Sequence, residues 1–262
     1  MAAAHRRMHR NFPVTDVRHD HNDRGAGHRR RVAGQQQGLA ERDQRPGHEG
    51  QRSQPDQVVV EIEANAQALL TAERTALNFL QRLSGVATLT AQYVELVRGT
   101  RAQILDTRKT TPGYRLLEKR AVADGGGTNH RMGLYDRAMV KDNHLVAEGG
   151  LPALQVAIHQ LHLEMPEVKV ELEADNLDQV RQFLKLEGVD YILLDNMSLA
   201  EMSEAIEARG ERSLPQFEAS GGVTLKTLRE IADTGVDFIS VGALTHSAPA
   251  LDIGLDFTPL DS

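Results

Sequence analysis

The chain has 262 residues, a formal net charge of −7 and no cysteine. That length is enough for one large α/β core and a small accessory domain. Without cysteine there is no disulfide, no thiolate metal site and no thiol nucleophile. The sequence also lacks an apolar run long enough for a membrane span and the hydrophobic core of a secretion signal, so we expect a cytoplasmic protein with no membrane partner.

Residues 1–56 differ in composition from the rest of the chain. They hold eleven Arg and no Lys, six of the eleven His, and seven large apolar residues. A segment with so few apolar side chains cannot bury enough surface to offset the entropy lost on ordering. We therefore interpret residues 1–56 as a disordered or aberrant segment. An Arg-rich arm for nucleic acid is the less favoured alternative, and we expect no nucleic-acid partner.

Hydrophobic periodicity begins with Val58–Ile62, which is typical of a β-strand. Asn65 can cap a following helix that has leucines at helical spacing. Gly85 should end this helix, and a second helix should close at Gly99. We interpret residues 57–100 as the remnant of a small N-terminal α+β domain with bridging helices.

Over residues 101–262, short β-rich runs alternate with helical patterns, which indicates a parallel sheet. The glycine fingerprint of a Rossmann unit is missing, so a barrel is favoured. The predicted fold class is α/β, an open (βα) barrel with parallel strands, plus a small N-terminal α+β domain that is truncated or degenerate here. The expected strands are 103–106, 138–141, 168–173, 191–195, 217–220 and 238–242; the expected helices are 151–163, 177–186, 199–208 and 225–234.

A cluster of cations lies within an otherwise acidic chain. From Arg108 to Lys141 there are eight Arg or Lys against three acids. Such a local cluster favours small anions over a long polyanion, which would need a basic face across the surface. Arg108, Arg131 and Lys141, with His130 beside them, are candidate ligands for carboxylates, because a guanidinium binds carboxylate oxygens in pairs. Ordinary surface charge is the alternative for any one of them.

Acids and glycines end the expected strands at the edge where barrel enzymes carry their catalytic groups. Glu173 and Asp195 end adjacent strands, where they are suited to hold ribose hydroxyls or to carry Mg²⁺ through water. They can equally be counter-ions for Lys109 and Lys141, and both roles are compatible.

Glycine turns close the last two strands, at Ser220-Gly221-Gly222 and at Gly242. Glycine allows backbone amides to approach a phosphate closely, and His246 is placed as a further phosphate partner. Tight turns that bind nothing are the alternative.

Seven segments, in order, resemble the quinolinate phosphoribosyltransferase family, also called carboxylating nicotinate-nucleotide pyrophosphorylases. The resemblance runs from about Gln57 to the C-terminus. The segments are Ala72–Asn78, Asp106–Thr110, Gly126–Arg131, Lys141–His144, Leu194–Asn196, Ser220–Gly222 and Val241–His246.

This resemblance implies a pentosyltransferase of NAD biosynthesis. With Mg²⁺, quinolinate and phosphoribosyl pyrophosphate would give nicotinate mononucleotide, pyrophosphate and CO₂. The family resemblance also implies a homodimer or a higher oligomer, in which the N-terminal domain of one subunit covers the active site of its partner.

The same resemblance assigns roles to individual residues. Quinolinate would be bound by Arg108, His130, Arg131 and Lys141, joined by Arg74 from the other subunit. Phosphoribosyl pyrophosphate would be bound by Lys109, Glu173, Asp195, Ser220, Gly221, Gly222, Gly242 and His246, with Glu173 and Asp195 also facing the metal. The catalytic group implied is Lys109, Lys141, Glu173 and Asp195.

Two alternatives stay open. A pyrophosphorylase-like paralogue linked to molybdenum transport has the same fold, although intact Arg108, Arg131 and Lys141 favour quinolinate. The second alternative is a catalytically impaired barrel, because residues 1–56 show nothing of the family's N-terminal sheet and helices.

Overall fold

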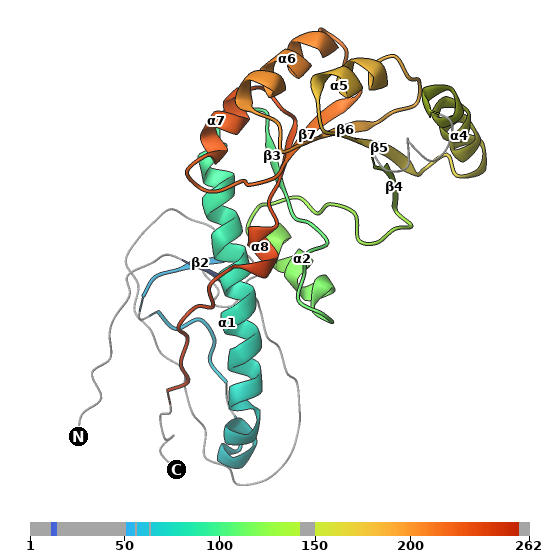
Figure 1. Ribbon diagram of the computed structural model, residues 1–262. Helices are drawn as coiled ribbons and strands as arrows, with labels where there is room; N and C mark the ends of the chain where they lie inside the picture. Colours follow the sequence, from blue (N-terminus) through green and yellow to red (C-terminus); the bar gives the residue numbers. More distant parts are fainter. Residues whose placement is uncertain (1–11, 15–50, 56, 63, 142–149, 257–262) are drawn as a thin grey trace. The chain divides into compact units, whose positions relative to one another are not determined.

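The computed structural model describes residues 12–14, 51–55, 57–62, 64–141 and 150–256 (Figure 1). These residues form two compact units. The first consists of the described parts of Met1–Ala91, Arg120–Gly126 and Ala248–Ser262, and the second of those of Gln92–Lys119 and Gly127–Ser247.

The second unit is built on a six-stranded sheet with the strand order β3-β8-β7-β6-β5-β4. All five neighbouring pairs are parallel, and β3 and β4 form the two edges, so this is an open α/β barrel. Each expected strand occurs, with its ends displaced by at most two residues. The strands are β3 (Gln103–Leu105), β4 (Arg137–Val140), β5 (Lys169–Ala174), β6 (Tyr191–Asp195), β7 (Gln216–Ser220) and β8 (Phe238–Ser240).

Helices return the chain between the strands, and α5, α6 and α7 lie along the outer face of the sheet (Figure 1). The four expected helices occur with ends displaced by at most three residues. Helix α2 is not anticipated by the hydrophobic pattern, because charged residues interrupt its apolar face. The helices are α2 (Arg115–Asp124), α4 (Gly150–Glu164), α5 (Leu177–Phe183), α6 (Leu199–Arg209), α7 (Leu228–Asp233) and α8 (Ala243–His246).

Apolar side chains fill the layer between the sheet and its outer helices. Central strand β6 buries Ile192, Leu193 and Leu194 in succession, which is the continuous apolar run expected of a parallel strand covered on both faces. Helices α5 and α6 begin at side-chain caps, Asn176 and Ser198. These caps fix where each strand ends and its helix begins.

A buried carboxylate holds the amino-terminal ends of two strands. Asp237 precedes β8 and is 4% exposed. Its Oδ2 accepts hydrogen bonds from Arg209 Nη1 at 2.5 Å and from the Phe217 amide at 2.8 Å, while Arg101 pairs with its other oxygen. These contacts lie at the amino-terminal ends of the strands, whereas the predicted catalytic residues lie at the carboxyl ends.

The first unit contains most of α1 (Ala66–Leu96). Asn65 caps it as predicted, with Oδ1 accepting the Gln67 amide at 2.8 Å. The predicted break at Gly85 is wrong, because the helix continues through this residue. A Cβ on Gly85 would overlap the carbonyl oxygen of Pro249, so the glycine permits close approach of another segment rather than ending the helix.

Two other expectations concern the region before α1. The strand expected at Val58–Ile62 is wrong, because these residues have no ladder partner among the described residues. A short antiparallel pair lies further upstream, between β1 (Phe12–Val14) and β2 (Gln51–Ser53). The disorder expected for residues 1–56 falls mostly on residues outside the described set, and the domain limits at 56 and 100 stay predictions.

The close approach at Gly85 gives a test of the first unit. Gly→Ala inside a helix normally stabilises it by about 1 kcal/mol. Here we expect Gly85→Ala to lower the unfolding free energy by about 1–3 kcal/mol, because the methyl group must displace the backbone at Pro249. Urea titration measures the difference, and Thr75→Ala on the exposed side of α1 is the control that should not destabilise. A stabilised Gly85→Ala chain would contradict this packing.

Candidate active site

Asp106 and Lys119 form an ion pair inside the second unit, with 0% and 1% of their surface exposed. The Lys119 ammonium also donates to the carbonyl oxygen of His130 at 2.8 Å, and the amide of His130 donates to Asp106 Oδ1 at 2.8 Å. The amide nitrogen of Asn129, in the orientation that satisfies both its ends, donates to Asp106 Oδ2 at 2.7 Å. The pair therefore joins the end of β3, helix α2 and the segment around His130.

The loop after β3 carries Arg108 and is anchored from α2. Arg115 donates from Nη2 to the Arg108 carbonyl at 3.2 Å and from Nη1 to the Met132 carbonyl at 3.0 Å. Glu118, fully buried, accepts hydrogen bonds from both the amide and the hydroxyl of Thr111. Arg115 thus links two segments that carry predicted substrate-binding cations, while the Arg108 side chain stays exposed.

Arg131 has a partly buried guanidinium that is held against β4. Its Nη1 donates to the Arg137 carbonyl at 3.4 Å, and its Nη2 lies 3.1 Å from Met139 Sδ. Burial lowers the pKa of Arg131, and the nearby positive charges of Arg108 and Arg137 lower it further, although the carboxylates of Glu171 and Asp136 act in the opposite direction. Because these cations repel one another, an anion bound among them would be stabilised.

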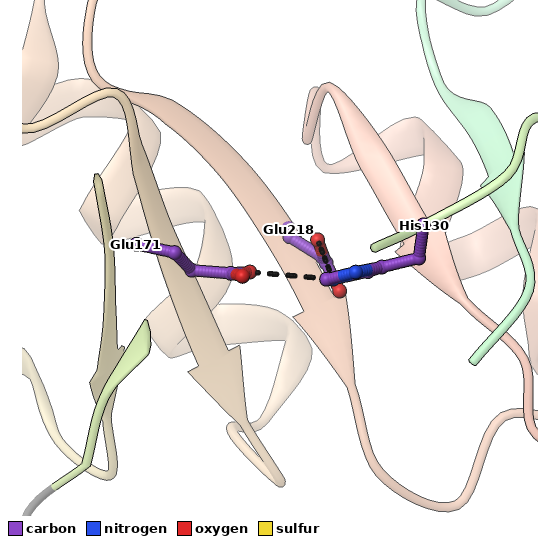
Figure 2. A group of neighbouring side chains, drawn as sticks. All are labelled: His130, Glu171 and Glu218. Atoms are coloured by element: carbon purple, nitrogen blue, oxygen red, sulfur yellow. Dashed lines mark ion pairs between the residues drawn. The ribbon is translucent and has the colours of Figure 1, made fainter. Parts of the chain in front are cut away.

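His130 points between a glutamate of β5 and a glutamate of β7, two strands that β6 separates (Figure 2). Its Nε2 lies 3.5 Å from Glu171 Oε1 on β5 and 3.2 Å from Glu218 Oε2 on β7. Arg137 Nη1 is 3.4 Å from Glu171 Oε2, and its guanidinium stacks 4.2 Å from the centre of the Tyr191 ring. We call His130, Arg137, Glu171 and Glu218 the interior cluster.

The interior cluster retains a proton near neutral pH. Burial disfavours a charged His130, but Glu171 and Glu218 outweigh it and raise the pKa of His130 to about 9. Burial also raises the pKa of Glu218. The Arg131 amide nitrogen lies 2.6 Å from His130 Nδ1. With His130 protonated, the positive charges of His130 and Arg137 balance the negative charges of Glu171 and Glu218.

Lys141 and Glu173 form an ion pair at the carboxyl ends of β4 and β5. The ammonium lies 2.9 and 2.6 Å from the two oxygens of Glu173, as expected for its role as a counter-ion. One carboxylate oxygen each of Glu173, Asp175 and Asp195 lie within 4.8 Å of one another. Three carboxylates in this spacing offer the oxygen ligands that Mg²⁺ prefers.

The glycine turns after β7 and β8 meet side chains from neighbouring loops. Gly221 has a φ of +96°, and a Cβ there would overlap the side chain of Asn196, which itself donates to Asp195. A Cβ on Gly242 would lie 3.1 Å from His246 Nε2 and 3.3 Å from Lys109 Cδ. Lys109, Gly242 and His246 therefore converge, although they are far apart in the sequence.

The structure brings most of the predicted residues together in the second unit. Arg74 is the exception, because it lies on α1 in the first unit, with an exposed side chain. Residues 142–144 of the predicted motif after Lys141 lie outside the described residues. Glu171, Glu218 and Asp175 were not predicted, yet Glu171 and Glu173 alternate along β5 and so face the same side of the sheet. This alternation is the feature of the sequence from which Glu171 could have been predicted as a neighbour of Glu173.

The chain matches two parts of one family. Residues 86–256 match the model of the quinolinate phosphoribosyl transferase C-terminal domain, and residues 45–84 match the model of its N-terminal domain. The N-terminal match thus includes residues 45–56, within the segment interpreted above as disordered or aberrant. Among the helices that the structure describes, none combines the length and apolar character that crossing a membrane requires.

Individual relatives extend this similarity. The nicotinate-nucleotide pyrophosphorylase [carboxylating] of Mycobacterium leprae is 46% identical over 209 residues, covering 79% of this chain and 72% of the relative. A mitochondrial quinolinate phosphoribosyltransferase [decarboxylating] of Nicotiana glauca is 44% identical, covering 74% of this chain and 58% of the relative. The solved nicotinate-nucleotide pyrophosphorylase of Francisella tularensis is 38% identical with a TM-score of 0.73, covering 80% and 72% of the two chains.

The raised pKa of His130 predicts how the stability of the chain depends on pH. The folded chain holds the cluster's proton up to about pH 9, whereas an unfolded histidine loses it near 6.5. The stabilisation is therefore complete below pH 6.5 and is lost as pH rises to about 9, with a slope of up to ~1.4 kcal/mol per pH unit. Urea titrations of the wild type and of Glu218→Gln across this range measure it, and the variant should show a shallower slope.

Asp237→Asn is the matched control, since it alters a buried carboxylate at the amino-terminal ends of the strands of the same sheet. It should lower stability without changing the slope. A wild-type curve that is flat between pH 6.5 and 9 would contradict the assignment of the proton.

Proposed function

We propose an activity for this chain from the premise that it belongs to the quinolinate phosphoribosyl transferase family. It transfers the phosphoribosyl group of phosphoribosyl pyrophosphate to quinolinate with loss of CO₂, giving nicotinate mononucleotide and pyrophosphate. The observation that carries this proposal is the partly buried guanidinium of Arg131, which lies among the positive charges of Arg108 and Arg137. Such a group favours a small, multiply charged anion.

Quinolinate has two adjacent carboxylates on one ring. Arg108 and Arg131 come from two segments that Arg115 ties together, so their separation is restrained before a substrate arrives. Restraint of this kind lowers the entropy cost of binding a rigid dianion. We assign Arg108, Arg131 and Lys141 to these carboxylates, and we extend the assignment to Arg74 of a partner subunit.

The phosphorylated sugar requires donors at a second place. Gly221 and Gly222 both have positive φ values, which leave backbone amides accessible without an intervening side chain. Ser220, Gly242, His246 and Lys109 supply the remaining hydroxyl, amide, ring and ammonium groups. We assign this group to the 5′-phosphate, with Lys109 towards the pyrophosphate.

The acidic residues at the carboxyl ends of β5 and β6 are suitable ligands for magnesium. Glu173 and Asp195 were predicted for this role, and Asp175 adds a third carboxylate within 4.8 Å. These residues would hold the ion, directly or through water, and the ion when bound would neutralise charge on the pyrophosphate. Lys141 already neutralises part of the charge on Glu173.

The chemistry then follows from positioning and charge. Cations hold two anions together so that the pyridine nitrogen can attack the anomeric carbon, and pyrophosphate leaves with the electron pair of the broken C–O bond. The carboxylates of Glu173 and Asp195 would stabilise the positive charge that develops on the sugar. The quaternised ring then loses its 2-carboxylate as CO₂, and the vacated carbon takes a proton.

The sequence left open two alternatives to this activity. The relatives are named for quinolinate or nicotinate-nucleotide chemistry, so the paralogue linked to molybdenum transport is not favoured. A catalytically impaired barrel remains an outcome of the assay, because the match to the N-terminal domain begins only at residue 45. The homodimer and the cytoplasmic location stay predictions.

Arg131→Ala tests the assignment of the carboxylate site. Loss of its paired hydrogen bonds should reduce CO₂ release from quinolinate, phosphoribosyl pyrophosphate and Mg²⁺ by ~100-fold or more. Trapping CO₂ from quinolinate labelled at the 2-carboxylate measures this. Arg229→Ala, at an exposed i,i+4 pair on α7, is the control that should keep wild-type turnover. Near-normal activity of Arg131→Ala would refute the assignment.

A mixing experiment tests whether Arg74 acts across a subunit interface. Arg74→Ala and Arg131→Ala chains should each be inactive alone. If each site takes Arg74 from the partner, co-refolded mixtures should recover about a quarter of wild-type activity, because half of the dimers are mixed and one of their two sites is intact. Mixtures that stay inactive while mixed dimers form would show that Arg74 acts within its own chain or not at all.

A further inference from the structure

Asn196 follows strand β6 in a backbone conformation that few side chains adopt. Its φ is +53°, and in the part of the chain that the structure describes it is the only residue other than glycine with a positive φ. Asparagine tolerates this left-handed region better than most residues, because its short side chain bonds locally. The segment Leu194–Asn196 carries part of the family resemblance, yet the proposed function gives Asn196 no role.

The backbone of Asn196 is held by the segments around it. Its amide donates to the carbonyl oxygen of Ser220 on β7 at 2.9 Å. The next residue, Met197, is 7% exposed, and Ser198 then caps helix α6 in a capping box with Glu201. The chain therefore passes from β6 into α6 within three residues, and the left-handed conformation of Asn196 is part of this short turn.

The side chain of Asn196 lies between two groups assigned above to phosphoribosyl pyrophosphate. Its Nδ2 donates to Asp195 Oδ2 at 2.9 Å. Because a carboxylate only accepts hydrogen bonds, the nitrogen of the amide faces Asp195 and the oxygen is directed away from it. That oxygen lies over Gly221, where a Cβ would come within 2.0 Å of it. Asn196 thus fills the space between the carboxylate that ends β6 and the glycine turn that follows β7.

These two contacts restrain the places that one ligand has to reach. The hydrogen bond from Asn196 uses one oxygen of Asp195, so the other can accept from a ribose hydroxyl or a metal-bound water. The 5′-phosphate is assigned to the turn at Gly221, whose approach to β6 is limited by the Asn196 amide. A ligand that spans both places binds more tightly when their separation is set beforehand, because less conformational entropy is lost.

We propose that Asn196 is a positioning residue that fixes the Asp195 carboxylate relative to the Gly221 turn, and thereby sets the affinity for the ribose 5-phosphate part of the substrate. It acts through these two residues without touching the ligand. The inference rests on the proposed function and goes beyond it, since the roles implied by the family resemblance leave Asn196 out.

A simpler explanation is that position 196 needs only a residue that tolerates a positive φ. Glycine meets that requirement better than asparagine and has no side chain. The two explanations therefore predict different results for Asn196→Gly. If only the backbone matters, glycine serves at least as well as asparagine. If the amide positions Asp195 and Gly221, glycine fails.

Asn196→Gly is the test, with both KM values measured by CO₂ release at a saturating level of the other substrate. The KM for phosphoribosyl pyrophosphate should rise about 5- to 20-fold, as expected for loss of one hydrogen bond to a charged group. The KM for quinolinate should stay within about twofold, since none of its assigned ligands comes from β6 or β7. Tm should stay within about 3 °C of the wild type, because glycine adopts this φ without strain.

Asn176→Gly is the matched control. Asn176 lies two residues after the neighbouring strand β5, and its side chain accepts a hydrogen bond from the Gln179 amide of its own helix at 3.0 Å. Loss of this cap should lower Tm and leave both KM values within about twofold. An equal rise in the KM for phosphoribosyl pyrophosphate in both variants would show that a loosened loop is the cause, and would overturn the inference.

Calorimetric titration with nicotinate mononucleotide adds a readout without turnover or metal. This product contains the ribose 5-phosphate, so its Kd should rise about 5- to 20-fold in Asn196→Gly, while the Kd of quinolinate stays within about twofold. An unchanged Kd for the mononucleotide, equal losses for both ligands, or an Asn196→Gly chain that does not fold would each overturn the inference.

Failure of the proposed function has a different outcome. A folded wild-type chain that binds neither quinolinate nor nicotinate mononucleotide, and releases no CO₂, sinks the proposed function itself. A wild type that turns over quinolinate, with an Asn196→Gly chain of unchanged kinetics, sinks only the role of Asn196.

Discussion

Asp106 and Lys119 meet inside the barrel almost without exposure to water, and three segments depend on where they meet. Two isolated charges in this position would cost several kcal/mol each, so the pair is stable only because further hydrogen bonds complete it. The amide and carbonyl of His130 and the side chain of Asn129 supply those bonds. The segment that carries Arg131 is consequently fixed to β3 and α2.

The positive charges of the site divide into two groups with different tasks. In the interior cluster, the positive charges of Arg137 and of protonated His130 are balanced by Glu171 and Glu218, so these cations do not require a bound anion. Arg108 and Arg131 repel each other, and an anion bound between them would relieve that repulsion. A rigid, electrically balanced cluster next to two arginines allows a site to attract anions without rearranging.

Periodicity and strand-end chemistry were enough to predict the parallel sheet and its six strands. Two glycines show where reasoning of this kind fails and where it succeeds. Gly85 looks like a helix stop, but it is required by the close approach of Pro249, a residue distant in sequence. Gly221 is also in contact with a distant side chain, Asn196, but there the turn was predicted correctly because its positive φ is a local property.

The interior cluster was missed for a related reason. A glutamate inside a β-rich run is read as a solvent-facing residue, and the sequence does not reveal that Glu171 and Glu218 face each other across a histidine from another segment. The role of His130 as a ligand of quinolinate was inferred from family resemblance and stays a prediction.

A structure of this chain with quinolinate bound measures the central claim most directly. The account predicts that the carboxylates of the bound molecule lie within hydrogen-bond distance of Arg108, Arg131 and Lys141. A ligand bound elsewhere would contradict it.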